Sequence, residues 1–359
     1  MDPFRLLRWL ILPATLAAAC GAALAQPTAP LPPVTVTGKG VRDPVEKSYR
    51  KMVRGMDLFE RNRALAPQAT LAFRLLPRKP DTDMKSVRVD VVARDFEFNV
   101  PVAPDGTFTL PRNREALAAD AVVSPNRRQL TMTWRTEVRT PGLPPFTRRL
   151  GDLRLECAVG MEAGLVSNNR GLFDFITDFF TESPDYCNGR GQRYLFFSER
   201  PLFGVTLVGG GRRQMVPVDR LYAGATGDPT LPAELPFCDC EVLLDRTYFL
   251  PLGDRNWPDD TLVEFEFMDD PARPQPANET LPLQRALDAV VVGQSTRADL
   301  VAALGPMTTI RFDNGYSVAV HRGPPVRKDG DAPELVVLFS PTGQALKTRV
   351  RPAEDNGRP

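Results

Sequence analysis

Residues 86–100 read SVRVDVVARDFEFNV, and apolar and polar side chains alternate along most of this stretch. Successive side chains of a β-strand point to opposite faces of its sheet, so a period of two residues predicts strands with one buried and one exposed face. The same period recurs in residues 130–138, where threonine, arginine and glutamate fall on the face expected to meet solvent. We therefore predict that residues 67–165 form an antiparallel β-sandwich, in which Asp105 and Gly106 supply a turn.

A second region with strand character follows at residues 191–270. Valine and phenylalanine alternate with glutamate in residues 263–267, and the three glycines at 209–211 lie between two strand-like runs, as at the tip of a hairpin. This region, which includes a strand-like run at residues 242–244, predicts a second sandwich or a second sheet of the first one. Residues 166–190 repeat apolar side chains at helical spacing and predict an amphipathic connecting helix. The protein is thus expected to be mainly β.

A helix is predicted ahead of the first β region, at residues 41–66. Asp43 is a suitable N-cap, Pro44 fits the first helical position and Glu46 completes a capping box. Apolar side chains then fall on one helical face. They are Val45, Tyr49, Met52, Met56 and Phe59.

The N-terminus has the parts of a bacterial export signal, which we assign to residues 1–25. Arg5 and Arg8 give a positive start, and an apolar run leads to the small-residue cleavage site ALA. The predicted location is therefore the periplasm or the exterior. Residues 17–20 (AAAC) resemble a bacterial lipoprotein box, so the alternative is an outer-membrane lipoprotein anchored through Cys20. Membrane contact is expected only in that case.

Three segments are expected to lie outside the folded parts. Residues 26–40 and 271–282 are rich in proline and predict linkers, and residues 352–359 predict a tail.

The charge of the chain is balanced. Removal of the export signal takes away one acidic and two basic residues and leaves equal numbers of both. Such a chain has no overall field to attract nucleic acid, so no nucleic-acid partner is expected. The arginine pairs at 127–128, 148–149 and 212–213 are scattered and predict solvated strand ends.

Four cysteines follow the export signal, an even number that suits disulfides in an oxidising compartment. Cys157 lies in phase with neighbouring apolar side chains, as expected of the buried half of a bridge. If residues 238–240 are extended, the Cα atoms of Cys238 and Cys240 stand roughly 6.6 Å apart, at the far limit of bridge geometry. We therefore predict that each of these two cysteines pairs with Cys157 or Cys187.

The sequence contains few candidates for catalytic or metal-binding residues. His321 is the only histidine, so a multi-histidine metal site is excluded and a nucleophilic triad would have to be built around this side chain. No glycine-rich phosphate loop, zinc-protease helix or serine-hydrolase elbow occurs. We expect no catalytic residue and no cofactor.

Two groups of acidic residues are further candidates for a site. Asp174, Asp178 and Glu182 recur every four residues on the connecting helix, where a solvated polar face explains them. The other group surrounds Trp257 and offers oxygen ligands for calcium, but its spacing matches a calcium loop at the first two ligands only, and a turn is the preferred interpretation. This group comprises Asp254, Asn256, Asp259 and Asp260.

The C-terminal segment resembles a known family. Residues 292–301 lead into a helix that Ser295 or Thr296 can cap and that Gly305 and Pro306 end, and strand-like runs follow. This pattern resembles the SmpA/OmlA (BamE-like) family, the small lipoprotein component of the outer-membrane β-barrel assembly machinery.

The resemblance covers residues 287–351. It implies that residues 283–351 form a small α+β interaction module, without implying membership of the assembly machinery. The candidate binding residues within this module are Phe312, Tyr316 and His321.

A shorter resemblance concerns residues 86–111. The run VAPDGTFTLP at residues 102–111 resembles the turn of transthyretin-like, carboxypeptidase-regulatory sandwiches, which implies the same kind of β-sandwich.

The sequence supports three interpretations of function. The first is a non-enzymatic envelope protein that binds another protein or the cell wall, which suits the lack of catalytic motifs and the disulfide-ready cysteines. The alternative is an envelope hydrolase of glycan or peptide, which predicts two inward carboxylates, one with a raised pKa, in an aromatic-lined cleft. The third is a secreted enzyme inhibitor, which predicts a concave sheet with exposed aromatic side chains at residues 312–339.

Overall fold

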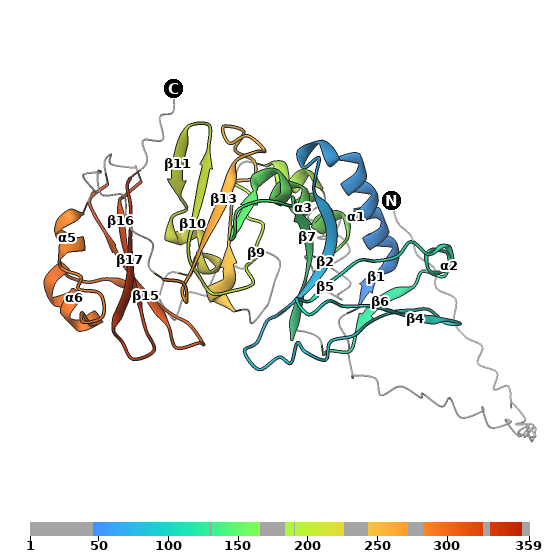
Figure 1. Ribbon diagram of the computed structural model, residues 1–359, viewed down its shortest axis with the longest axis horizontal. Coiled ribbons are helices and arrows are strands. Elements are labelled where there is room, and N and C mark those ends of the chain that lie inside the picture. The colour runs from blue at the N-terminus through green and yellow to red at the C-terminus, as the bar shows by residue number, and fades with distance from the viewer. Residues whose placement is uncertain are drawn as a thin grey trace, which may run out of the picture. The chain divides into compact units, whose positions relative to one another are not determined.

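The computed structural model describes residues 46–128, 131–165, 184–189, 191–225, 243–271, 283–325 and 331–353. Within these stretches the strands form five sheets whose pairings are all antiparallel, which confirms the predicted mainly β fold (Figure 1). No helix in the described stretches has the length and apolar character needed to span a membrane. Several predicted segments lie outside these stretches: the export signal, the first linker, residues 272–282 of the second linker and residues 166–183 of the connecting helix. Three cysteines also lie outside them, Cys20, Cys238 and Cys240.

Two sheets of the first β region enclose one hydrophobic core. The strands of one, in spatial order, are β1 (Lys47–Ser48), β6 (Val122–Pro125), β3 (Val89–Val92) and β4 (Glu97–Val100). Those of the other are β5 (Thr107–Phe108), β2 (Thr70–Pro77) and β7 (Met132–Arg139). Val89 and Val91 from the first sheet and Phe73 and Trp134 from the second belong to the same core and are at most 1% exposed. The alternation in the sequence therefore marks the inward face of each sheet.

The turn at Asp105 and Gly106 carries the chain from one sheet to the other. Gly106 has a φ of 82°, and a Cβ there would stand 2.6 Å from the carbonyl oxygen of Leu75, so only glycine fits. Asp105 Oδ1 accepts a hydrogen bond from the backbone N–H of Thr107 at 3.0 Å. The turn does not close a hairpin, because β4 pairs with β3 whereas β5 pairs with β2.

The N-terminal helix is shorter than predicted. Helix α1 (Tyr49–Arg61) is capped by Ser48, whose Oγ accepts from the N–H of Lys51 at 3.3 Å. Asp43 and Pro44 lie outside the described residues, and the predicted start is wrong because residues 47 and 48 pair with β6 as a strand. The predicted apolar face is confirmed at Tyr49, Met52 and Phe59, which are buried.

The largest difference from prediction is helix α3 (Leu150–Glu162), within the stretch expected to be all strands. Residues 150–161 are all buried. A helix that is buried all round has no polar stripe, so its 3.6-residue period is absent from the sequence pattern. Its apolar residues Leu153, Leu155 and Val159 then happen to match the alternation of a strand.

The second β region builds on the first. Its sheet runs, in spatial order, β11 (Arg212–Met215), β10 (Leu202–Gly209), β13 (Leu262–Phe267) and β8 (Thr147–Arg149). Gly210 and Gly211, with φ values of 58° and 73°, form the tip of the β10–β11 hairpin, as predicted. Because β8 precedes α3 in the chain, this sheet draws strands from both predicted regions. Of the strand-like run expected at residues 242–244, residue 242 lies outside the described stretches, and Leu244 begins the 3₁₀-helix Leu244–Arg246.

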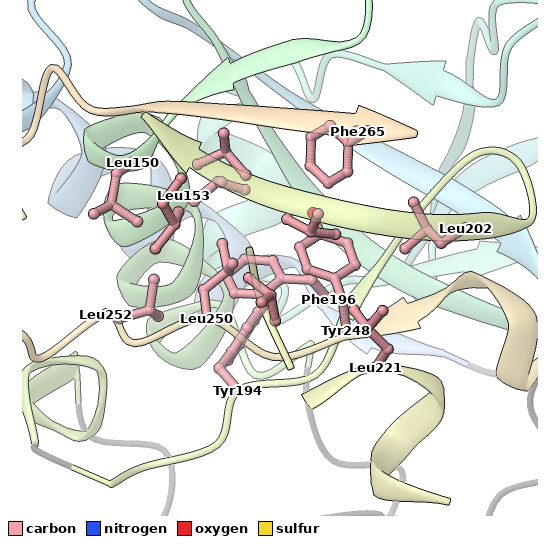
Figure 2. Packing of buried hydrophobic residues seen from close by; sticks show 14 of the residues in the cluster. Leu150, Leu153, Tyr194, Phe196, Leu202, Leu221, Tyr248, Leu250, Leu252 and Phe265 are labelled. Atoms are coloured by element: carbon pink, nitrogen blue, oxygen red, sulfur yellow. The ribbon is translucent and has the colours of Figure 1, made fainter. Parts of the chain in front are cut away.

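A small sheet of β9 (Phe196–Phe197) and β12 (Thr247–Tyr248) adds aromatic side chains to the second core. The rings of Phe196 and Tyr248 stack with centroids 5.3 Å apart, and Tyr248 meets the ring of Phe265 at 5.3 Å. Figure 2 shows these rings packed together, with Leu150 and Leu153 of α3 in the same cluster. Helix α3 is therefore part of the core.

The C-terminal segment is a four-stranded sheet with two short helices on one face (Figure 1). Its elements are α5 (Gln284–Asp288), α6 (Arg297–Leu304), β14 (Thr308–Arg311), β15 (Ser317–Arg322), β16 (Glu334–Phe339) and β17 (Ala345–Arg351). Thr296 caps α6 in a capping box with Asp299, and Gly305, with a φ of 83°, ends the helix. The predicted helix punctuation is confirmed, with Thr296 rather than Ser295 as the cap.

The other face of this sheet is not free. Ile310, Phe312, Val318 and Val336 belong to the core that contains α3 and β10, and the ring of Phe312 lies 4.8 Å from that of Tyr222. The C-terminal segment therefore shares a hydrophobic core with the second β region.

Candidate functional site

A cleft of about 90 Å³ lies where the β2–β7 pair meets the β8–β13 and β9–β12 pairs. We call it the aromatic–arginine cleft. It is lined by Arg74, Glu137, Arg139, Phe146, Arg148, Phe197, Ser198, Glu199, Tyr248, Phe265 and Phe267. Aromatic rings and arginines make up most of this lining.

Phe146 is the exposed aromatic group of the cleft. It is 47% exposed, and its φ of 57° is unusual for a bulky residue. The backbone is fixed because the carbonyl oxygen of Phe146 accepts from the N–H of Phe265 at 2.9 Å. Its ring meets that of Phe267 edge-on at 5.2 Å, and the guanidinium of Arg200 lies 5.4 Å and 4.5 Å from the two ring centroids. A strained residue that presents an apolar ring to solvent is typical of a functional position.

Ion pairs form the polar wall of the cleft. Arg74 contacts Glu199 at 2.8 Å and Glu137 at 3.3 Å. Arg139 contacts the same two carboxylates, at 2.7 Å for Glu199. Both carboxylates are thus neutralised by arginine.

Behind this wall, a buried ion pair joins β8 to α3. Arg148 Nη2 donates to Glu156 Oε2 at 2.6 Å, and both side chains are about 5% exposed. The same oxygen accepts from the N–H of Val138 at 3.1 Å, while Arg148 Nη2 also donates to the carbonyl oxygen of Val138 at 2.6 Å. Arg148 Nε has no hydrogen-bond partner among the described residues.

Acidic side chains of α3 accept hydrogen bonds from backbone N–H groups at the end of β7, as a neighbouring strand would. Besides Glu156, Asp152 accepts at 2.8 Å from the N–H and from the hydroxyl of Thr140. The face of β7 that was predicted to meet solvent is therefore buried, including Arg135 and Glu137. The prediction was wrong because these polar groups are held inside the protein rather than in water. Glu137 pairs with arginines, whereas Arg135 donates to the carbonyl oxygen of Trp134 and lies over the ring of Phe197, with its Nε unpaired among the described residues.

The two glutamates at this wall have opposite pKa shifts. Burial alone would raise the pKa of Glu137, but the charges of Arg148, Arg139 and Arg74 outweigh it and hold this pKa below its ordinary value. Burial raises the pKa of Glu156. Burial also raises the pKa of Tyr248 above its ordinary value.

We expect the lowered pKa of Glu137 to make stability depend on pH in acid. The folded state binds fewer protons than the unfolded chain there, so the stabilisation is present above the ordinary pKa of 4.5 and is lost as pH falls below it. Urea unfolding from pH 6 to pH 3 should show a smaller loss of unfolding free energy for Glu137→Gln than for the native protein. A control, Glu97→Gln at an exposed position, should follow the native protein. Equal losses for native and Glu137→Gln would contradict this.

Cys157 forms a disulfide with Cys187, with their Cα atoms 6.0 Å apart. The prediction that both pair with Cys238 and Cys240 is wrong. Cys157 lies on α3 rather than on a strand, and the 3₁₀-helix Pro184–Asn188, which carries Cys187, packs directly against α3.

The candidate calcium ligands are not gathered into one site. Asp259 Oδ1 accepts from Arg154 at 2.5 Å, and Asp254 Oδ1 accepts from the N–H of Asn256 at 3.0 Å, as in a turn. No cluster of three or more potential metal ligands occurs among the described residues. The second acidic group, Asp174, Asp178 and Glu182, lies outside them.

The candidate binding residues of the C-terminal segment do not form an exposed face. Phe312 is 8% exposed against Tyr222, Tyr316 is half-buried against the same core, and His321 is half-buried within β15. Phe339 is 1% exposed. The described residues of 312–339 therefore form no exposed aromatic face of the kind expected of an inhibitor. The second β region covers Phe312, whereas Phe339 lies in the core with α5 and α6.

Sequence reasoning missed the residues that make the cleft. Arg148 was assigned to a solvated strand end, yet it is 5% exposed. Phe146 follows two prolines in the run TPGLPPF, and this proline-rich turn just before a strand was the one available indication of a constrained loop.

Comparison with protein-family models, with curated proteins and with solved structures finds no match to this chain.

Proposed function

We propose that the chain is a non-enzymatic protein of the bacterial envelope, exported by residues 1–25, and that it binds a partner protein at the aromatic–arginine cleft. The observation that carries this proposal is Phe146, an exposed ring held in a strained conformation beside a wall of arginines. The resemblance of residues 287–351 to the SmpA/OmlA family supports an envelope location.

The composition of the cleft favours a protein partner. Aromatic residues and arginine are enriched in protein–protein interfaces and supply most of their binding hot spots. The wall beside Phe146 is held by ion pairs among Arg74, Glu137, Arg139 and Glu199. These side chains would therefore lose little conformational entropy when a partner binds, which favours affinity.

A carboxylate-dependent hydrolase is the second candidate, because Glu137 and Glu156 have opposite pKa shifts near an aromatic-lined cleft. The contacts of both groups argue against it. Glu156, the group with the raised pKa, is 4% exposed and is held by Arg148 and by the backbone of Val138. Glu137 is neutralised by arginines, so neither group is placed to deliver a proton to a substrate.

Sedimentation with isolated cell envelopes tests this function. We expect the processed native protein to bind saturably and Phe146→Asn to bind about 30-fold more weakly, as for a hot-spot residue. Asparagine tolerates a positive φ, so this variant should keep the fold. Leu117→Asn, at a position 36% exposed on α2 (Arg114–Ala118), is the matched control and should bind like the native protein.

The supernatants of the same sedimentation experiment distinguish a binding protein from a hydrolase. A binding protein leaves no soluble envelope fragments in the supernatant. Fragments released by the native protein and not by Glu137→Gln would overturn the proposal in favour of a hydrolase.

A further inference from the structure

A second cavity, of about 310 Å³, shares no lining residue with the aromatic–arginine cleft. Its walls include Asp219, Arg220, Asp254, Trp257 and Arg351. The volume is at the lower end of the range for small-molecule sites, and we call it the polar cavity.

One wall of the polar cavity is a loop held from behind by Arg154. This arginine is 5% exposed and donates to the carbonyl oxygens of Leu252 at 2.9 Å, Asp254 at 2.8 Å and Trp257 at 2.9 Å. Trp257 is 1% exposed, and the guanidinium of Arg212 lies 3.7 Å from its ring centroid. The loop is therefore fixed before any ligand arrives, which is the condition for a specific site.

The lining also includes an arginine whose charge is already satisfied. Arg351 is 2% exposed, and it donates to Asp331 at 2.7 Å and to Glu334 at 3.1 Å. Glu334 also accepts from the N–H of Val218 at 3.1 Å, which fixes the neighbouring 3₁₀-helix Val218–Arg220. Arg351 and Asp331 thus line the cavity as a satisfied ion pair and leave no charge for a ligand.

Three other charges remain available. The guanidinium of half-buried Arg220 and the exposed carboxylate of Asp219 have no ion-pair or hydrogen-bond partner in the described part of the chain. The carboxylate of Asp254 accepts one hydrogen bond, from the N–H of Asn256 at 3.0 Å. Arg220 and Asp219, without a described side-chain partner, and Asp254, whose carboxylate accepts a single described hydrogen bond, thus line the same cavity.

We propose that the polar cavity binds a small zwitterion of the size of an amino acid or dipeptide. The carboxylate of the ligand pairs with Arg220, whose planar donor group suits bidentate binding of a carboxylate. The ammonium group of the ligand pairs with Asp219 and Asp254. A purely anionic ligand would leave both carboxylates facing its charge, and a purely cationic one would leave Arg220 without a partner.

Titration calorimetry with three probes tests this site in the processed protein. The probes are L-alanyl-L-alanine, its N-acetyl form without the ammonium group, and its C-terminal amide without the carboxylate. We expect saturable binding of the free dipeptide and at least tenfold weaker binding of both blocked forms, because each loses a charge-assisted hydrogen bond.

Variants test which residues bind the carboxylate and the ammonium group of the ligand. Arg220→Gln should weaken the dipeptide at least tenfold, and so should Asp219→Asn/Asp254→Asn, whereas Arg213→Gln on the neighbouring hairpin should have no effect. Thermal unfolding of each variant checks the fold, which should persist because Arg220 and Asp219 hold no described ion pair. Absence of saturable dipeptide binding at millimolar concentration would overturn the proposal, as would equal binding of a blocked form or native affinity in a folded Arg220→Gln variant.

Discussion

Replacing Glu156 by glutamine is expected to lower the free energy of unfolding by about 3–5 kcal/mol. Glu156 is 4% exposed, and one of its oxygens accepts from Arg148 at 2.6 Å and from the N–H of Val138 at 3.1 Å. The substitution leaves the buried positive charge of Arg148 without its hydrogen-bonded carboxylate. Urea unfolding at pH 7, monitored by tryptophan fluorescence, measures the change.

Two control variants separate the buried charge from the general effect of a substitution. Glu264→Gln removes the partner of Arg213 from a pair whose arginine side chain is 52% exposed, and should cost about 1 kcal/mol or less. Replacing both buried partners, in Arg148→Met/Glu156→Leu, should recover part of the stability, because no unpaired charge remains. If Glu156→Gln costs no more than Glu264→Gln, the ion pair between α3 and β8 is not a structural link.

Replacing Cys157 and Cys187 together by alanine is expected to lower the free energy of unfolding by about 3–4 kcal/mol. The disulfide joins residues that are 30 positions apart, and its loss restores the freedom of that loop in the unfolded chain. Both cysteines are buried, at 0% and 4% exposure, so alanine also removes buried volume. Unfolding of the oxidised native protein and of the variant, both without reductant, measures the difference.

Peptide mapping under non-reducing conditions checks the pairing itself. We expect one linked pair of peptides that contains Cys157 and Cys187. The variant Cys238→Ala/Cys240→Ala should retain this link and serves as the matched control. A peptide that links Cys157 to Cys238 or Cys240 would contradict the pairing.

Local rules of sequence predicted the parts of the fold that have one buried and one exposed face. The alternation in residues 263–267 corresponds to β13, whose side chains alternate between buried and half-buried. Glycines at turns were equally informative, because Gly106 and Gly305 have φ values of 82° and 83° that other residues avoid. Capping residues located α6 for the same reason, since the cap satisfies backbone groups within a few residues.

Prediction failed where polar side chains are buried. Asp152, Arg154 and Glu156 made α3 resemble the alternating strand of a half-exposed sheet, but each is satisfied by a partner distant in sequence or by a neighbouring strand. Arg135 and Glu137 on β7 were likewise predicted to face solvent, but both are buried. A sequence pattern cannot distinguish a polar group in water from one paired in the interior, and the aromatic–arginine cleft is built largely from such groups.

The C-terminal segment illustrates a second limit. Its helix and strands were predicted from local rules, but the burial of its open sheet face was not. Phe312 and Val336 pack against the core of the second β region, and Glu334 accepts from the N–H of Val218. Removal of residues 283–351 would therefore expose a hydrophobic core, so truncation is a poor test of what this segment binds.

Site-specific photo-crosslinking tests the proposed binding role of the aromatic–arginine cleft most directly. p-Benzoylphenylalanine replaces Phe146 in one version of the full-length protein and Leu117 in another, and cells producing each version are irradiated. We expect a discrete protein adduct from position 146, absent from position 117 and reduced when Arg139 is also replaced by glutamate. Adducts of equal pattern and yield from both positions, or none from position 146, would contradict the assignment of the cleft as the binding site.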